Sequence, residues 1–261
     1  MEKLENKEFV MLHRIFAILA FLVVFIAHAM TVSPSVPFWD CAERLTAMTW
    51  QQIPHPPGTP FFAMLGRLFQ IIIPFGDLGW RGNMLPVTAS GVIVSFLYLM
   101  SVLVIKNFRK DGISSFSDAL AVHGSAFIGS IAFGLSGTFW FNSVEAETYN
   151  IAILSVVIVM YLLMRWTQVA DEKGNERYLL LSIYLIGISM GIHQLSLLVI
   201  FTMILVVYFR KYETTVKSFT IMSVFTIILF YIIFMVVVIS LPAFSECGCG
   251  AVGAGRRVCA R

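Results

Sequence analysis

Long apolar runs alternate with short charged connectors along almost the whole chain. A helix needs about 20 apolar residues to cross the hydrocarbon core of a bilayer, and uncharged runs of that order are typical of membrane spans. The pattern therefore predicts an all-α fold, a polytopic transmembrane helical bundle. The candidate spans are 9–30, 84–105, 119–141, 150–166, 179–193, 195–209 and 219–241.

Two segments depart from this regular pattern. The stretch 179–209 is short for two crossings, so a single kinked unit is an alternative to two spans. The apolar segment 60–75 begins at Pro60, contains Pro74 and carries Arg67. It is too short to span, and we expect an interfacial or re-entrant helix there.

Composition excludes a soluble domain and gives no sign of a nucleic-acid partner. The chain is 58% hydrophobic and 13% charged, whereas a soluble domain is about 45–50% apolar and about 25% charged. The net charge is only +3. Residues 1–244 contain no nucleotide-binding GxxxxGK or GxGxxG loop. No Cys and His cluster indicates a metal site within the fold, so no cofactor is expected, and a divalent metal stays an open alternative. A lipid-borne substrate entering from the bilayer fits better than a nucleotide.

Lys and Arg in the short connectors predict the orientation of the chain. With the N-terminus in the cytoplasm, the run 9–30 acts as a signal anchor, and most basic connectors lie inside. The outer segments are then 31–83, 142–149 and the turn at 191–193. The basic residues expected inside are Lys3, Lys7, Arg14, Lys106, Arg109, Lys110, Arg165, Lys173, Arg177, Arg210, Lys211 and Lys217.

The last residues, 245–261, differ in kind from the rest. They are rich in Gly, Ala, Cys and Arg and lack an apolar period. We interpret them as a disordered tail that is not native to the fold, such as the product of a frameshift or truncation, and residues 1–244 as the transmembrane domain. A short metal-binding tail is the alternative. Its cysteines are Cys247, Cys249 and Cys259.

Two acids and a histidine in the first outer segment are candidates for chemistry. Asp40 and Glu43 are three residues apart, so a helix after Pro37 would present both on one face. Helix N-terminal acids or surface pairing with Arg44 are the structural alternatives. The position directly after a span favours a general base. His55 lies among four prolines in residues 54–60, which predicts a stiff loop holding an imidazole at the interface, with a solvated connector as the alternative.

Other polar residues fall on the same predicted face. Glu145 and Glu147 are two apart and cannot share a helix face; helix capping competes with a functional role. His193 follows two glycines and is either a packed, hydrogen-bonded side chain or part of a site. Arg67 and Arg81 are suited to a phosphate, although anchoring to lipid headgroups is equally compatible.

Several of these residues lie in motifs that together resemble one family. The motifs are FWDCAE at 38–43, HPPGTP at 55–60, LGRLF at 65–69, WRGN at 80–83, FW at 139–140, SVEAETY at 143–149 and GISMGIH at 187–193. In this order they resemble a bacterial multi-span membrane family that shares a domain with an animal transmembrane O-mannosyltransferase. The resemblance covers about residues 9–210.

The resemblance implies a GT-C-like bundle with interfacial helices in the first outer loop, located in the bacterial inner membrane. It implies a glycosyltransferase that moves mannose or another hexose from a polyprenyl-phosphate donor to a hydroxyl of an acceptor protein or glycan, inverting the anomeric centre. Asp40 would be the catalytic base and Glu43 would assist. The expected substrate-binding residues are His55, Arg67, Arg81, Glu145, Glu147 and His193.

Two other functions compete with this interpretation. A transporter or flippase of a lipid-linked or small polar substrate needs ionisable groups near the bilayer midplane, whereas these acids gather at one boundary. An inactive truncated fragment is the other alternative, because members of the family are usually longer. Some also carry an acid near Gly137.

Overall fold

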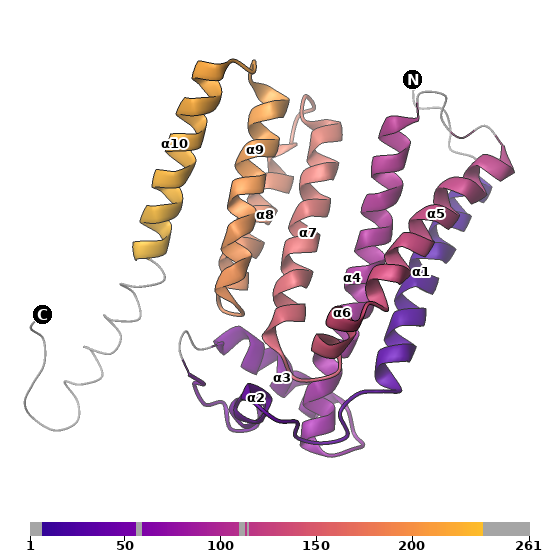
Figure 1. Ribbon diagram of the computed structural model, residues 1–261, viewed down its shortest axis with the longest axis vertical. Coiled ribbons are helices and arrows are strands. Elements are labelled where there is room, and N and C mark those ends of the chain that lie inside the picture. The colour runs from indigo at the N-terminus through magenta and orange to yellow at the C-terminus, as the bar shows by residue number, and fades with distance from the viewer. Residues whose placement is uncertain (1–6, 56–58, 110–112, 114, 237–261) are drawn as a thin grey trace, which may run out of the picture. The chain divides into compact units, whose positions relative to one another are not determined.

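The computed structural model describes residues 7–55, 59–109, 113 and 115–236, and the regular elements of these residues are all helices (Figure 1). The predicted all-α polytopic bundle is confirmed. The tail 245–261 lies outside the described residues. The chain divides into two compact units, residues 1–199 and 200–261. The first contains α1 (Lys7–Ala29), α2 (Asp40–Trp50), α3 (Pro60–Ile72), α4 (Leu78–Phe108), α5 (Phe116–Gly134), α6 (Gly137–Ser143), α7 (Thr148–Val169), α8 (Glu176–Met190) and the 3-10 helix η1 (Gln194–Leu198).

Helix α4 is the centre of the first unit. It packs against α1, α5 and α7, and also against α2 and α3. Its N-terminus is capped by Asp77, whose Oδ1 accepts a hydrogen bond from the Trp80 N–H at 2.6 Å. Its 31 residues extend about 46 Å at about 1.5 Å per residue, which exceeds the roughly 30 Å hydrocarbon thickness. The excess length supports α2 and α3.

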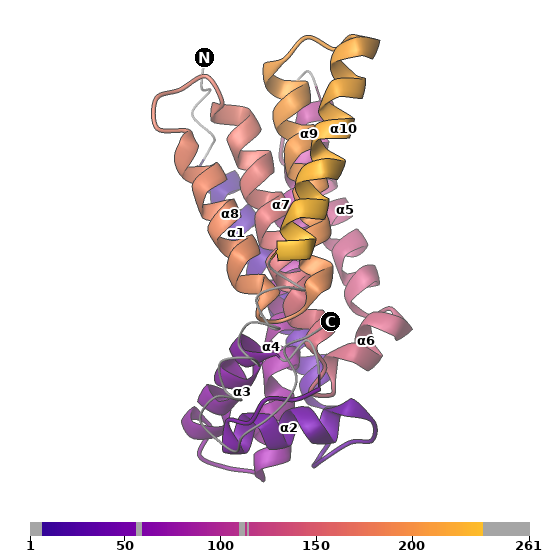
Figure 2. The same ribbon diagram turned by 90° about the vertical axis from the view of Figure 1, so that its left-hand side faces the viewer.

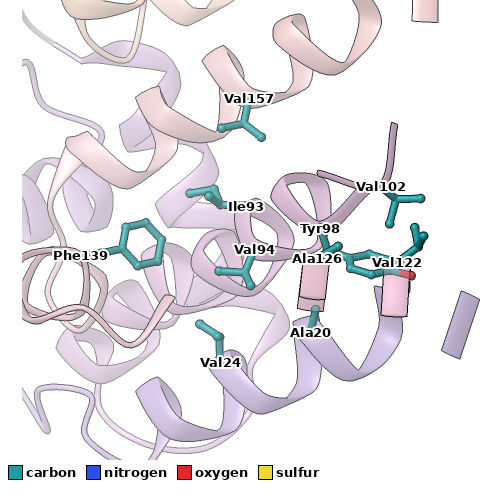
Figure 3. Packing of buried hydrophobic residues seen from close by; sticks show 10 residues of the cluster. All are labelled: Ala20, Val24, Ile93, Val94, Tyr98, Val102, Val122, Ala126, Phe139 and Val157. Carbon is teal, nitrogen blue, oxygen red and sulfur yellow. The ribbon is translucent and has the colours of Figure 1, made fainter. Parts of the chain in front are cut away.

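The main core of this unit lies between α1, α4, α5 and α7. Figure 3 shows its buried side chains, among them Val24 of α1, Val94 of α4 and Ala126 of α5. At Gly91 of α4 the backbones approach closely: a Cβ there would lie 2.8 Å from Cδ2 of Phe21 and 3.1 Å from its carbonyl oxygen. A glycine is therefore needed at this contact between α1 and α4.

We expect Gly91→Ala to destabilise the first unit by about 1–3 kcal/mol, because the added methyl group overpacks the α1–α4 contact. Gly129 of α5 provides the matched control, since nothing lies within 4 Å of a Cβ at that position. Gly129→Ala should be neutral or slightly stabilising, because alanine favours a helix over glycine. Thermal unfolding in detergent measures both. Equal midpoints for the two variants would contradict the close approach.

Six helical segments are long and apolar enough to cross a membrane within the described part of the chain. They correspond to all the predicted spans except 179–193, which forms the 15-residue α8. That helix would cover only about 22 Å, so its crossing stays a prediction. The helical path breaks at Gly191–His193, between α8 and η1. The predicted interfacial segment 60–75 forms the short apolar helix α3.

Two predicted boundaries are wrong. The segment 119–141 is not one helix, because α5 ends at Gly134 and α6 starts at Gly137. Gly134 lies where a Cβ would meet Val24 at 2.6 Å and Val94 at 2.8 Å, so the chain is pressed against two other helices at this break. The span expected to begin at residue 84 begins instead at Leu78, because Asp77 caps the helix earlier.

The second unit contains α9 (Val199–Lys211), apart from its first residue, and α10 (Val216–Ile233). Thr215 caps α10 by accepting a hydrogen bond from the Ser218 N–H at 3.2 Å. Tyr208 donates a hydrogen bond to Ser218 at 3.0 Å. Phe201 and Phe230 pack with ring centroids 4.7 Å apart, so side chains of the two helices contact one another at both places.

Candidate active site

One end of the first unit, called the site end below, carries α2, α3 and the connector between α6 and α7 (Figures 1 and 2). Helix α2 starts at Asp40 and buries Leu45 and Met48 in a second apolar cluster. Trp39 before it has φ 62° and ψ −150°, a region that favours glycine. The burial of one helix face fixes where Asp40, Glu43 and Arg44 project.

Arg44 is the buried cation of the site. Arg44 is only 7% exposed. Its guanidinium forms an ion pair with Glu147, which lies about 100 positions later in the α6–α7 connector. A second guanidinium nitrogen lies 3.4 Å from Oδ2 of Asp40. The expected pairing of Arg44 with Asp40 is present, but it does not lie at the surface. Arg44 is buried, and its closer partner is Glu147.

Glu43 holds His55 through two hydrogen bonds. The backbone N–H of His55 donates to Oε1 of Glu43 at 2.6 Å, and the ring Nδ1 lies 2.6 Å from Oε2. The ring hydrogen bond, followed by the backbone one, lowers the pKa of Glu43. The other ring nitrogen, Nε2, lies 3.8 Å from Oδ2 of Asp40. These contacts place the imidazole next to Asp40. Residues 56–58 of the predicted stiff loop lie outside the described residues.

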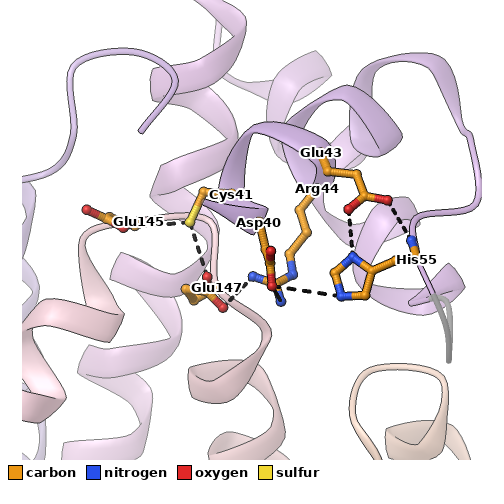
Figure 4. A network of polar contacts seen from close by, with 7 residues as sticks. All are labelled: Asp40, Cys41, Glu43, Arg44, His55, Glu145 and Glu147. Carbon is orange, nitrogen blue, oxygen red and sulfur yellow. Dashed lines mark hydrogen bonds and ion pairs between the residues drawn. The ribbon is translucent and has the colours of Figure 1, made fainter. Parts of the chain in front are cut away.

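Cys41 links the two acids of the α6–α7 connector. Its buried thiol donates to Oε1 of Glu147 at 3.2 Å and lies 3.6 Å from Oε2 of Glu145. Burial raises the pKa of the thiol, and the charge and hydrogen bond of Glu147 raise it further. The thiol therefore stays protonated and acts as a donor. In Figure 4 these side chains form a row, with Glu145 at one end and Glu43 with His55 at the other.

Glu145 faces a different environment from Glu147. It lines a cleft of about 400 Å³ together with residues of the loop before α2 and one residue of α6. Both carboxylates reach the Cys41 thiol, but only Glu145 is among the residues that line the cleft. Neither acid lies in a helix, so the prediction about helix faces stays untested. The lining residues are Ser33, Val36, Pro37, Phe38, Trp39, Phe141 and Glu145.

His193 also lies at the site end, where the chain leaves α8. Its ring Nδ1 accepts a hydrogen bond from the Leu195 N–H at 3.0 Å, and its ring centroid lies 5.1 Å from that of Tyr149. The preceding turn is tied to α3, because the Phe61 N–H donates to the Gly191 carbonyl at 3.1 Å. Burial lowers the pKa of His193, and the charge of Arg44 lowers it further.

The two predicted phosphate ligands on α3 and α4 differ in their surroundings. Arg81 donates from Nε to the carbonyls of Phe75 and Gly76, at 3.1 and 3.0 Å, and from a terminal nitrogen to the Gln70 carbonyl at 3.1 Å. It thereby ties the end of α3 to the start of α4. Arg67 lies in the middle of α3 and is partly exposed. A phosphate-binding role for either stays a prediction.

Three residues of the site could not be assigned from the sequence. Arg44 and Cys41 gain their partners from the distant α6–α7 connector. Asn83 is fully buried, and its amide donates to the carbonyls of Ser33 and Ser35 at 3.0 and 2.9 Å. The sequence offered one signal for this last role, the WRGN motif that contains Asn83. Among the described residues, no group of three or more His, Cys, Asp or Glu side chains is arranged to hold a metal ion.

Residues 40–216 match the family described as the Protein O-mannosyl-transferase TMEM260 N-terminal domain. The match begins at Asp40, covers more than half of the 261 residues and includes every site residue predicted from the sequence. The cleft residues before Asp40 precede the matched range. The chain belongs to this family.

Curated members of the family are similar at a low level of identity. Protein O-mannosyl-transferase TMEM260 of Mus musculus is 25% identical over 194 residues, which are 74% of this chain and 26% of the mouse protein. The Dictyostelium discoideum protein of the same name is 26% identical over 163 residues, which are 62% of this chain and 18% of that protein. The chain thus spans about a quarter or less of these relatives. No solved structure matches it.

The lowered pKa of His193 predicts a pH dependence of stability. The unfolded side chain titrates near its usual value of 6.5, whereas the folded one takes up a proton only at lower pH. The contribution of neutral His193 is therefore complete above that value and is lost as the pH falls towards the folded pKa.

We expect the thermal midpoint of the wild-type chain to fall more between about pH 7.5 and pH 5 than that of His193→Asn. Asparagine keeps a side-chain acceptor for the Leu195 N–H but does not titrate. Parallel pH profiles of the two proteins would show that His193 is not responsible.

Proposed function

We propose that this chain is a membrane glycosyltransferase that moves mannose or another hexose from a polyprenyl-phosphate donor to a hydroxyl group of a protein or glycan. The names of its relatives support transfer of mannose to an oxygen. The observation that carries the proposal is the setting of Asp40. Its carboxylate is 54% exposed, between a buried guanidinium and an imidazole, at one end of a membrane bundle.

Asp40 acts as the general base in this reaction. The acceptor hydroxyl gives its proton to the Asp40 carboxylate while its oxygen attacks the anomeric carbon of the donor. The bond between that carbon and the phosphate oxygen breaks, and its electron pair leaves with the polyprenyl phosphate. A direct displacement of this kind inverts the anomeric centre. Asp40 is accessible enough for both substrates to reach it.

The neighbours of Asp40 have separate roles. Arg44 contacts Asp40 from the buried side, which fixes the direction of the carboxylate. Glu43 orients the His55 ring by accepting a hydrogen bond from Nδ1, which leaves Nε2 next to Asp40. In the imidazolium form of the ring, Nε2–H is available to the departing phosphate. Arg67, partly exposed on α3, is the second candidate for that phosphate. Such preorganised donors stabilise charge that develops in the transition state.

The active site is assigned to the extracytoplasmic face of the membrane, with the N-terminus in the cytoplasm. This follows from the Lys and Arg distribution in the connectors. The structure supports it in one respect: Asp40, Glu145 and His193 lie at the same end of the first unit, and α4 ends and α5 begins at the opposite end (Figure 1). A lipid-linked donor would reach the site end from the bilayer.

The test is transfer by the chain itself in lipid nanodiscs. Radiolabelled mannosyl-phosphoryl polyprenol and a nucleoside-diphosphate mannose are offered separately, with Ser- and Thr-containing peptides or oligomannoside as acceptors. We expect label in the acceptor only from the lipid donor. Transfer from the nucleotide donor alone would refute the polyprenyl-phosphate assignment. No transfer from either donor by a folded chain would refute the activity.

A further inference from the structure

The cleft beside Asp40 has walls that are held in place before any ligand binds. The loop before α2 is fixed by Asn83, which donates to two of its carbonyls. The same loop is joined to the opposite wall, because the Ser33 N–H donates to the Val144 carbonyl at 2.9 Å. Largely preformed concave sites of this kind are typical of small-ligand binding. The cleft is therefore available as a binding site next to the proposed base.

Its lining combines exposed aromatic rings with a single carboxylate. Phe38 and Trp39 are 88% and 89% exposed, and the acid among the lining residues is Glu145. An aromatic face packs against the C–H face of a pyranose ring, and an ionised carboxylate accepts hydrogen bonds from hydroxyl groups. A neutral, polyhydroxylated ring satisfies both features at once.

Charge argues against the phosphate as the occupant. Glu145 lines the cleft. The Cys41 thiol lies between the carboxylates of Glu145 and Glu147 and contacts both. Arg44, the nearest guanidinium in this row, is directed at Glu147 and Asp40 (Figure 4). The residues that line the cleft include the Glu145 carboxylate but no Lys, Arg or His. A phosphate in the cleft would therefore be repelled by Glu145 without a neighbouring cation to offset the repulsion.

We propose that this cleft is the hexose subsite of the enzyme, with the Trp39 indole under the ring and Glu145 accepting its hydroxyl protons in hydrogen bonds. The inference rests on the proposed function and adds to it a place for the sugar. Trp39 directly precedes Asp40, so a sugar stacked on its indole lies beside the base. The phosphate then lies outside the cleft, towards His55. Glu145 is thus a positioning residue for substrate, and Glu147 holds Arg44.

The subsite is tested by binding that does not require turnover. Methyl α-D-mannopyranoside is titrated against the nanodisc-reconstituted chain, with saturation-transfer NMR as the readout. We expect Trp39→Ala and Glu145→Ala to weaken binding at least about fivefold, a loss of one good contact. Trp39→Phe should keep most of it, because an aromatic face remains. Asp40→Asn should still bind the sugar.

Trp50 provides the matched control, because it lies at the other end of α2, is 72% exposed and does not line the cleft. An equal loss in Trp50→Ala would indicate membrane anchoring by tryptophan and would overturn the subsite. Unchanged binding in both Trp39→Ala and Glu145→Ala would overturn it as well.

Steady-state kinetics then distinguish the source of the sugar. A higher KM for the lipid donor in Trp39→Ala assigns the cleft to the donor hexose, and a higher KM for an oligomannoside acceptor alone assigns it to the acceptor hexose. Either result supports the subsite. Transfer by the wild-type chain with unchanged KM values in the variants would leave the proposed function standing and refute the subsite. Mannoside binding that depends on Trp39 without any transfer would refute the function alone.

Discussion

Replacing Asp40 with asparagine should reduce mannosyl transfer at least about 100-fold, the usual contribution of a positioned general base. The asparagine amide has nearly the same shape as the carboxylate but cannot take up the proton of the attacking hydroxyl group. Since the Asp40 side chain is 54% exposed and its nearest Arg44 nitrogen is 3.4 Å away, stability should change little. Transfer from mannosyl-phosphoryl polyprenol in nanodiscs measures the loss.

Two further variants make this result specific. Asp171→Asn changes the same chemical group in the connector between α7 and α8, and should keep full activity. Asp40→Glu retains a carboxylate in a displaced position, so that partial activity is expected. If Asp40→Asn transferred sugar at the wild-type rate, Asp40 would not be the base, and the mechanism proposed above would have to be abandoned.

Removing the Arg44 guanidinium should have the largest effect on stability. The side chains of Arg44 and Glu147 are 8% and 14% exposed. In Arg44→Met, the Glu147 carboxylate would lose its ion-pair partner in a site that excludes most water. Breaking a buried ion pair from one side costs about 3–5 kcal/mol, and we expect a loss of this order. Denaturant or thermal unfolding in mixed micelles measures it.

A double mutant separates this pair from general damage. Arg44→Met combined with Glu147→Gln removes both charges, so its loss should be smaller than the sum of the single losses, with a coupling of about 0.5–3 kcal/mol. Arg109 and Asp118 form the control pair at 2.9 Å, with 35% and 29% exposed side chains. Arg109→Met should cost less than about 1 kcal/mol. Additive losses at Arg44 and Glu147 would exclude the ion pair as their cause.

The helices could be predicted because their signal is local. Apolar runs of sufficient length located all six long candidate spans, and Pro60 marked the start of α3. The ends of the helices were harder to predict. Gly134 ends α5 where Val24 and Val94 press against it, a contact between segments about 110 and 40 positions away. No local pattern contains that information.

In the site too, features that depend on neighbouring residues could be predicted, and features that depend on distant segments could not. The Asp40–Glu43 spacing could be predicted, because it depends only on neighbours in the sequence. The stiffness of the loop around His55 stays a prediction, since residues 56–58 lie outside the described residues. The burial of Arg44 could not be predicted, since it depends on Glu147 arriving from the α6–α7 connector. Near Asp40 and Glu43 in the sequence, Arg44 looks like a surface residue. Only the packing of α2 against distant parts of the chain makes it a buried cation.

The buried thiol of Cys41 has a practical consequence for experiments on this protein. Its side chain is inaccessible and its pKa is raised, and alkylating reagents attack the exposed thiolate. In the native chain, slow modification of Cys41 would therefore report transient detachment of α2 from the α6–α7 connector, whichever side of the bilayer the reagent is on. Peptide-resolved mass spectrometry can follow this one residue. The rate at which Cys41 is modified therefore measures how often the site opens locally. Ligands that hold α2 in place should lower this rate.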